Sequence, residues 1–230
     1  MTDYVDLGGH RVEIRRHATA RHVRLSVDPR VGGFRLTVPK RAALTPALQW
    51  ARGQVDWVAR KATDIPTVCP IISGMQIPFG DGYLIVDWRT AYPRIPRRVF
   101  DTLQVGGAES DLSARVIRWL KRAALRQLTI DTREIAGRGG LDVGRIGVGD
   151  PRSRWGSCSA KGDIRYSWRL IMAPVHVRLA TVAHEVAHLR HMNHGAEFHQ
   201  LVEQLHDGDV SAARAWLRAE GSTLHRIGQA

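Results

Sequence analysis

The sequence lacks any apolar run near the roughly 20 residues that a membrane-spanning helix needs. Its first residues, MTDYVD, also lack the basic start and apolar stretch of a secretory signal, so the cytoplasm is the expected location. Cysteine is scarce, because Cys69 and Cys158 are the only two, which excludes a disulfide framework and a four-thiolate zinc site. A metal site in this chain must therefore use histidine and carboxylate ligands.

Lysine is scarce too: 30 of the 34 basic residues are arginine, and the net charge is +12. Residues 1–61 carry 12 basic and 5 acidic side chains, whereas residues 62–150 have a net charge of +2 and residues 151–230 of +3. Such an excess is typical of a nucleic-acid or phosphate partner. Because no stacking-aromatic motif accompanies it, a solvated strand surface is the favoured interpretation.

The patterning predicts an α+β protein whose 230 residues suffice for a catalytic domain with a smaller companion. Residues 1–108 form the expected β-rich N-terminal region. A hairpin is predicted from the strands 22–27 and 34–39, a helix over 45–61, and two further strands over 83–88 and 97–105. Residues 109–230 form the expected hydrolase domain. Its helices are predicted over 111–135, 174–190, 196–206 and 210–220, and its strands over 145–149 and 163–171.

Seven of the 11 histidines fall between His176 and His206, and one segment reads AHEVAHL, an H-E-x-x-H motif in a helical pattern. Residues four apart share a face of a helix, so His184 and His188 can hold one ion. Glu185 is turned about 100° away, where it can reach a water on that ion. Zinc lowers the pKa of such a water toward about 7, and a carboxylate then takes its proton. Apolar flanking residues favour this metal site over a chance pair of surface histidines.

The third ligand is a choice between several residues. His191 follows on the same helical face as His184, but about 10 Å farther along the axis, too far for one zinc with nitrogen ligands at about 2.1 Å. His194 can fold back toward the site if the helix has ended, and Asn193 and Gly195 favour such a break. His194 is therefore the predicted ligand. The helix that follows offers the alternatives Glu197, His199 and Glu203.

Several motifs together resemble the YgjP-like metallopeptidase family. They are RWGSC at 154–158, Leu170, Pro174, HEVAHL at 184–189 and NHGAEF at 193–198. The last of these is also similar to the third-ligand segment of SprT-like proteases. The resemblance covers nearly the whole chain, although Ser167 stands where the family pattern has Asn.

This resemblance implies a zincin-like α+β domain in which three histidines bind one zinc ion and a glutamate is the base. The ligands are His184, His188 and His194, and the base is Glu185. It also implies a sheet edge that holds an extended peptide beside the active-site helix. The residues expected to bind substrate are Arg154, Trp155, Gly156 and His191. For Trp155, packing under the site is the favoured interpretation.

The leading interpretation is thus a zinc metallopeptidase that acts on a peptide or protein. One alternative is a metal-dependent hydrolase of nucleotides or other phosphoanhydrides, with arginines as phosphate clamps; the candidates are Arg152, Arg154, Arg165 and Arg169. Another is a non-catalytic, zinc-stabilised module that binds nucleic acid. No membrane partner is expected.

Overall fold

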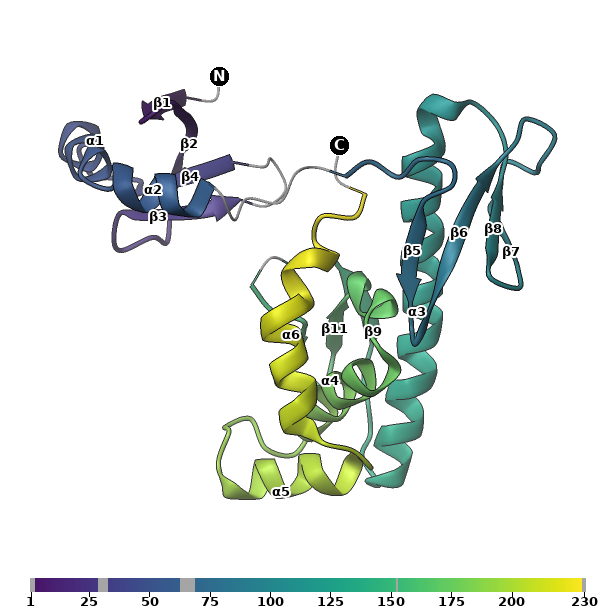
Figure 1. Ribbon diagram of the computed structural model, residues 1–230. Coiled ribbons are helices and arrows are strands. Elements are labelled where there is room, and N and C mark those ends of the chain that lie inside the picture. The colour runs from purple at the N-terminus through teal and green to yellow at the C-terminus, as the bar shows by residue number, and fades with distance from the viewer. Residues whose placement is uncertain (1–2, 29–32, 63–68, 152, 229–230) are drawn as a thin grey trace. The chain divides into compact units, whose positions relative to one another are not determined.

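The computed structural model describes residues 3–28, 33–62, 69–151 and 153–228 (Figure 1). The chain divides into two compact units, Met1–Pro70 with His225–Ala230, and Ile71–Leu224. Among the described residues, no helix combines the length and apolarity required to span a bilayer. The turn of the hairpin predicted from 22–27 and 34–39 falls at 28–33, and its residues 29–32 lie outside the described residues.

The first unit is a four-stranded sheet covered by two short helices. Its strands are β1 (Asp3–Leu7), β2 (His10–His17), β3 (Arg24–Asp28) and β4 (Gly33–Pro39), in the order β1-β2-β4-β3. The antiparallel pairing of β3 with β4 confirms the predicted hairpin. Its helices are α1 (Leu44–Arg52) and α2 (Val55–Ala62). The sequence predicted one helix here, but Gly53 ends α1, and its N–H bonds to the carbonyl of Gln49.

The second unit opens with a sheet of the same design. Its strands are β5 (Gln76–Phe79), β6 (Gly82–Trp88), β7 (Arg97–Val99) and β8 (Thr102–Val105), in the order β5-β6-β8-β7. Both four-stranded sheets have a central parallel pair flanked by antiparallel pairs. The single strand predicted over 97–105 is two strands, because the chain turns at Phe100, which has a φ of 55°.

A smaller sheet lies next to the helix that carries the H-E-x-x-H motif. It consists of β9 (Ile146–Gly149), β10 (Gly156–Cys158) and β11 (Ile164–Ser167), in the order β10-β11-β9, so β10 is an edge strand. The strand predicted over 163–171 ends at Ser167, whose hydroxyl accepts a hydrogen bond from Arg169 N–H and so caps the 3₁₀ helix η2 (Trp168–Met172).

Helix α4 is the central helix of the second unit. The helices of this unit besides η2 are η1 (Glu109–Asp111), α3 (Leu112–Arg138), α4 (Val175–Ala187), α5 (Ala196–Leu205) and α6 (Val210–Leu224). Helix α4 packs against α3, α5, α6, η2 and β10, and Figure 1 shows it between α3 and α6. The protein is therefore of the mixed α+β class, as the sequence predicted. Strands β5–β8, which the sequence-based division placed with residues 1–108, belong to the same compact unit as α4.

Two polar contacts fix α4 in place. Arg178 donates from Nε to Asp131 Oδ2 on α3 at 2.8 Å, and both side chains are buried. Gln127 donates to the other oxygen of that carboxylate at 2.8 Å, so both of its oxygens are bonded. At the N-terminus of α4, the Val175 N–H donates to Asp81 Oδ1 at 2.8 Å, which places a carboxylate where the helix dipole favours one. The helix is thus held from its side and from its end.

Candidate metal centre

Helix α4 delivers the first two residues of the site, His184 and Glu185, near its C-terminal end. Its apolar side chains are fully buried; Val182, Ala183, Val186 and Ala187 are each 0% exposed. The prediction that the motif stands on a buried helix is therefore confirmed. The helix could not rotate to present other residues without exposing this face.

The helix ends earlier than the sequence predicted, at Ala187 rather than near residue 190. The backbone N–H groups of Leu189 and Arg190 bond to the carbonyls three residues before them, at 3.0 and 3.1 Å, and form a tight final turn. His188 is the C-cap residue, and the chain reverses after it toward α5. This reversal is what allows His194 to return to the face that carries His184.

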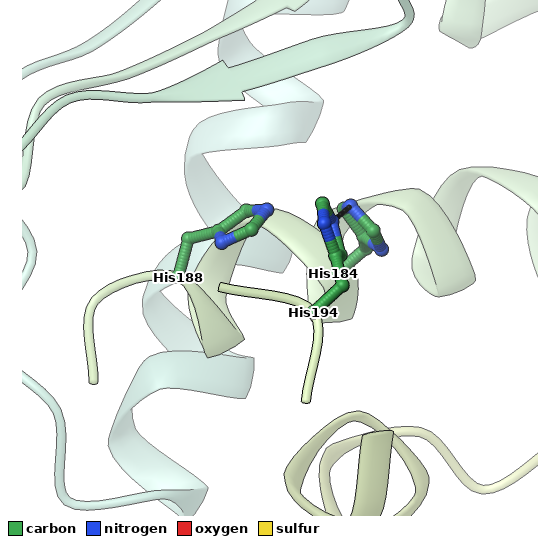
Figure 2. A group of neighbouring side chains, drawn as sticks. All are labelled: His184, His188 and His194. Carbon is green, nitrogen blue, oxygen red and sulfur yellow. Dashed lines mark hydrogen bonds between the residues drawn. The ribbon is translucent and has the colours of Figure 1, made fainter. Parts of the chain in front are cut away.

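Three imidazoles converge where the chain returns. The nitrogens that His184, His188 and His194 can offer to an ion all lie within 4.8 Å of one another. Figure 2 shows His184 and His194 side by side, with His188 reaching toward them from the end of the helix. Their ring centroids are 4.8 to 5.0 Å apart. Among the described residues, these three histidines form a group of side chains that could bind one metal ion together.

The donor set fits a tetrahedral metal ion such as zinc. Zinc–nitrogen bonds of about 2.0–2.1 Å place two ligand nitrogens about 3.3–3.4 Å apart. The Nε2 atoms of His184 and His194 are 3.2 Å apart, which is already close to that separation. The Nδ1 atom of His188 lies 3.0 Å from the carbonyl oxygen of His191. Since a carbonyl only accepts, Nδ1 carries the proton, and Nε2 keeps its lone pair for an ion.

Electrostatics hold two of these rings in the neutral form that binds metals. Burial, followed by the neighbouring His188 and His194, lowers the pKa of His184 to about 4. Burial also lowers the pKa of His188 below its ordinary value, although its bond to the His191 carbonyl opposes this. Both shifts favour the neutral imidazole, the form that binds a metal ion.

A phenylalanine that the sequence analysis did not single out supports the three rings. Phe198 on α5 is fully buried, and its ring centroid lies 4.6 to 4.9 Å from those of His184, His188 and His194. Such contacts restrict each imidazole to one orientation. The sequence feature that could have pointed to Phe198 is its position in the NHGAEF segment, four residues after the predicted third ligand His194.

Glu185 lies beside the edge strand β10. It is only 5% exposed, and burial raises its pKa to about 7, although the positive charge of Arg154 opposes the rise. Gly156 makes this position available, because a Cβ built there would lie 2.5 Å from both Cγ and Oε1 of Glu185. The strand and the carboxylate can approach this closely only with glycine at residue 156.

A family model for the YgjP-like metallopeptidase domain matches residues 21–220 of the chain. The chain belongs to the YgjP-like metallopeptidase family. Comparison with curated proteins and with solved structures found no match. Family membership indicates a metal-dependent hydrolase, and in the part of the chain that the structure describes the three convergent imidazoles form a group that could hold a metal ion.

The other candidate ligands lie outside the group of three imidazoles. His191 Nδ1 is 3.6 Å from Glu197 Oε2, so these two side chains face each other. The His199 ring centroid is 6.4 Å from that of His194. Glu203 lines a depression with His199 and residues of α6. In this YgjP-like protein, His194 is therefore the best-placed third donor among the candidates drawn from the sequence.

A pocket of about 260 Å³ opens beside the motif. Its floor includes His184 and Glu185, and one side is formed by Arg154, Trp155 and Gly156, three of the four residues expected to bind substrate. The fourth, His191, lines a separate depression with residues of the 190–198 turn. Helix α6 forms another wall, which the sequence analysis did not foresee; its lining residues are Val210, Ala213, Arg214 and Leu217.

Trp155 both lines this pocket and packs against α6. A Cβ at Gly221 would lie 2.7 Å from Cζ2 of the indole, so the ring rests directly on the backbone of that helix. Arg169, one of the four proposed phosphate clamps, is buried and paired with Asp150 at 3.1 Å, and is therefore not available to a substrate. Arg152 lies outside the described residues.

Proposed function

We propose that this YgjP-like protein is a zinc metallopeptidase of zincin-like architecture, with its catalytic part in residues 109–230. His184, His188 and His194 would hold the ion, and Glu185 would act as general base. The convergence of three imidazoles next to a buried carboxylate carries this proposal. A bound zinc ion supplies a Lewis acid that lowers the pKa of water toward about 7.

The chain's own residues account for the proton movements of peptide hydrolysis. Glu185 takes a proton from water on a carboxylate oxygen while the water oxygen attacks the peptide carbonyl carbon. The same carboxyl then gives that proton to the departing amine nitrogen as the C–N bond breaks. Burial of Glu185, which raises its pKa to about 7, suits a group that must both accept and release a proton near neutral pH.

The second candidate, a phosphoanhydride hydrolase, is supported by one observation: Arg154 lines the pocket that holds His184 and Glu185. A guanidinium there could bind phosphate oxygens. A screen of unstructured protein, short peptides and nucleoside triphosphates with the zinc-reconstituted full chain separates the two. Hydrolysis of peptide bonds that is lost in Glu185→Gln supports the peptidase, whereas release of phosphate or pyrophosphate alone contradicts it.

A further inference from the structure

Two arginines stand at the pocket beside Glu185. Arg154 lies two residues before the edge strand β10, and Arg214 belongs to α6. Both side chains are exposed, and within the described part of the chain neither has a hydrogen bond or ion pair. This contrasts with Arg169 and Arg178 of the same unit, whose charges are paired with carboxylates.

The charges of both guanidiniums reach the proposed reacting groups. Burial raises the pKa of Glu185, and the charge of Arg154 opposes that rise. Burial and the neighbouring imidazoles lower the pKa of His184, and the charge of Arg214 adds to this effect. The two arginines therefore border this pocket from two different elements, the segment before β10 and helix α6.

The rest of the lining is mostly apolar. Ala180 and Thr181 of α4 face the pocket, and α6 adds Val210, Ala213 and Leu217. Glu185 is the only carboxylate among the lining residues described. A cavity of about 260 Å³ with apolar walls and cationic edges suits a short side chain that has methylene groups and an anionic end.

We infer that this pocket binds a glutamate side chain of the peptide substrate, close to the bond that is cut. The methylene groups would lie against α6, and the carboxylate would reach Arg154 and Arg214. This inference rests on the proposed peptidase function. A glutamate suits the pocket better than a polyphosphate chain, because the apolar lining would cover its methylene groups but gives phosphate oxygens no donors beyond the two guanidiniums.

The test measures peptide binding by the zinc-reconstituted full chain carrying Glu185→Gln, which retains the pocket and stops cleavage. A single Glu is moved along an otherwise uncharged peptide, and each peptide is compared with its Gln counterpart. At one position the Glu peptide should bind roughly ten-fold more tightly, as expected for a partly desolvated charge-assisted contact. Adding Arg154→Ala or Arg214→Ala should lower that ratio, and both together should bring it near one.

Arg218→Ala is the matched control, because Arg218 is an exposed arginine of α6 that does not line the pocket. It should leave the ratio unchanged. Binding of the Gln peptide should be the same with and without Arg218→Ala, and an unchanged zinc content in the Arg154 and Arg214 variants separates loss of recognition from loss of fold.

The inference would be overturned by equal affinities for the Glu and Gln peptides at every position, or by a Glu preference that survives removal of both arginines. Absence of any peptide binding would overturn it as well. So would tighter, arginine-dependent binding of a nucleoside triphosphate. Peptide hydrolysis by the wild-type chain is measured separately. Hydrolysis without glutamate preference leaves the peptidase proposal intact and contradicts the pocket assignment. Glutamate preference without hydrolysis keeps the pocket as a glutamate-binding site and contradicts the peptidase proposal.

Discussion

The Nδ1 atom of His188 lies 3.0 Å from the carbonyl oxygen of His191, so His191 contacts the proposed metal ligand through its backbone. His191→Ala keeps that carbonyl and should leave zinc affinity within a few-fold of the wild type. His194→Ala removes one of three donors and should weaken zinc binding by at least about 100-fold, more than the loss of a supporting contact. Competition titration against a zinc indicator measures both.

If His191→Ala lost zinc and His194→Ala kept it, the proposed ligand set would be wrong. His199→Ala is the additional control, because its ring is close to that of His194 but its nitrogens lie outside the group of three. It should bind zinc like the wild type.

Glu185→Gln should keep one equivalent of zinc and lose hydrolysis by about 10²- to 10⁴-fold. The amide preserves the volume of the buried side chain but cannot accept a proton. Metal content by elemental analysis and initial rates on the same preparation decide the outcome. Loss of zinc in this variant would show that Glu185 has a role in ligation.

Gly156→Ala should reduce activity at least about ten-fold while zinc stays bound. The added Cβ would lie 2.5 Å from Glu185 Cγ, so either the carboxylate or the edge strand must move, and a misplacement near 1 Å can cost about 100-fold in rate. Gly147→Ala on β9 of the same sheet is the control, because a Cβ there meets nothing within 4 Å. Equal activities for the two variants would contradict a close fit between Gly156 and Glu185.

Asp131→Ala should lower the free energy of unfolding by about 3–5 kcal/mol, because it leaves the buried charge of Arg178 without a partner. Asp207→Ala removes the partner of Arg138 in a contact whose side chains are 42% and 87% exposed, and should cost less than about 1 kcal/mol. Urea denaturation of both variants gives the comparison. Similar losses would mean that the Asp131–Arg178 contact does not anchor α4.

Local sequence patterns predicted the helices of the second unit well. The apolar period of α3 and α4 and the His184–His188 spacing depend on residues close together in the chain, and so could be read directly. The third histidine also followed from local features, because Asn193 and Gly195 favour the turn that the structure contains. Its role in binding zinc stays a prediction, as do the roles of the other site residues.

Where the sequence analysis failed, short-range signals were weak or misleading. Strands β1 and β2 were missed, and the helix expected over 45–61 is broken at Gly53. The extra turn predicted for α4 is absent, because the chain closes on Val186 and Ala187 and frees a backbone carbonyl at His191 for the ring of His188. Helical periodicity cannot report such competition between a further turn and a side-chain contact.

By itself, the sequence determined that the chain is of the α+β class, that a histidine pair and a glutamate share one buried helix, and that a third histidine follows a turn. Only the tertiary structure decided what surrounds them: Gly156 against Glu185, Phe198 against the imidazoles, and α6 as one wall of the pocket. These contacts join segments that are distant in the chain and carry no shared period. They arise because the buried faces of α4 must pack against other elements, and the elements that do so, α3, α5, α6, η2 and β10, come from different parts of the chain.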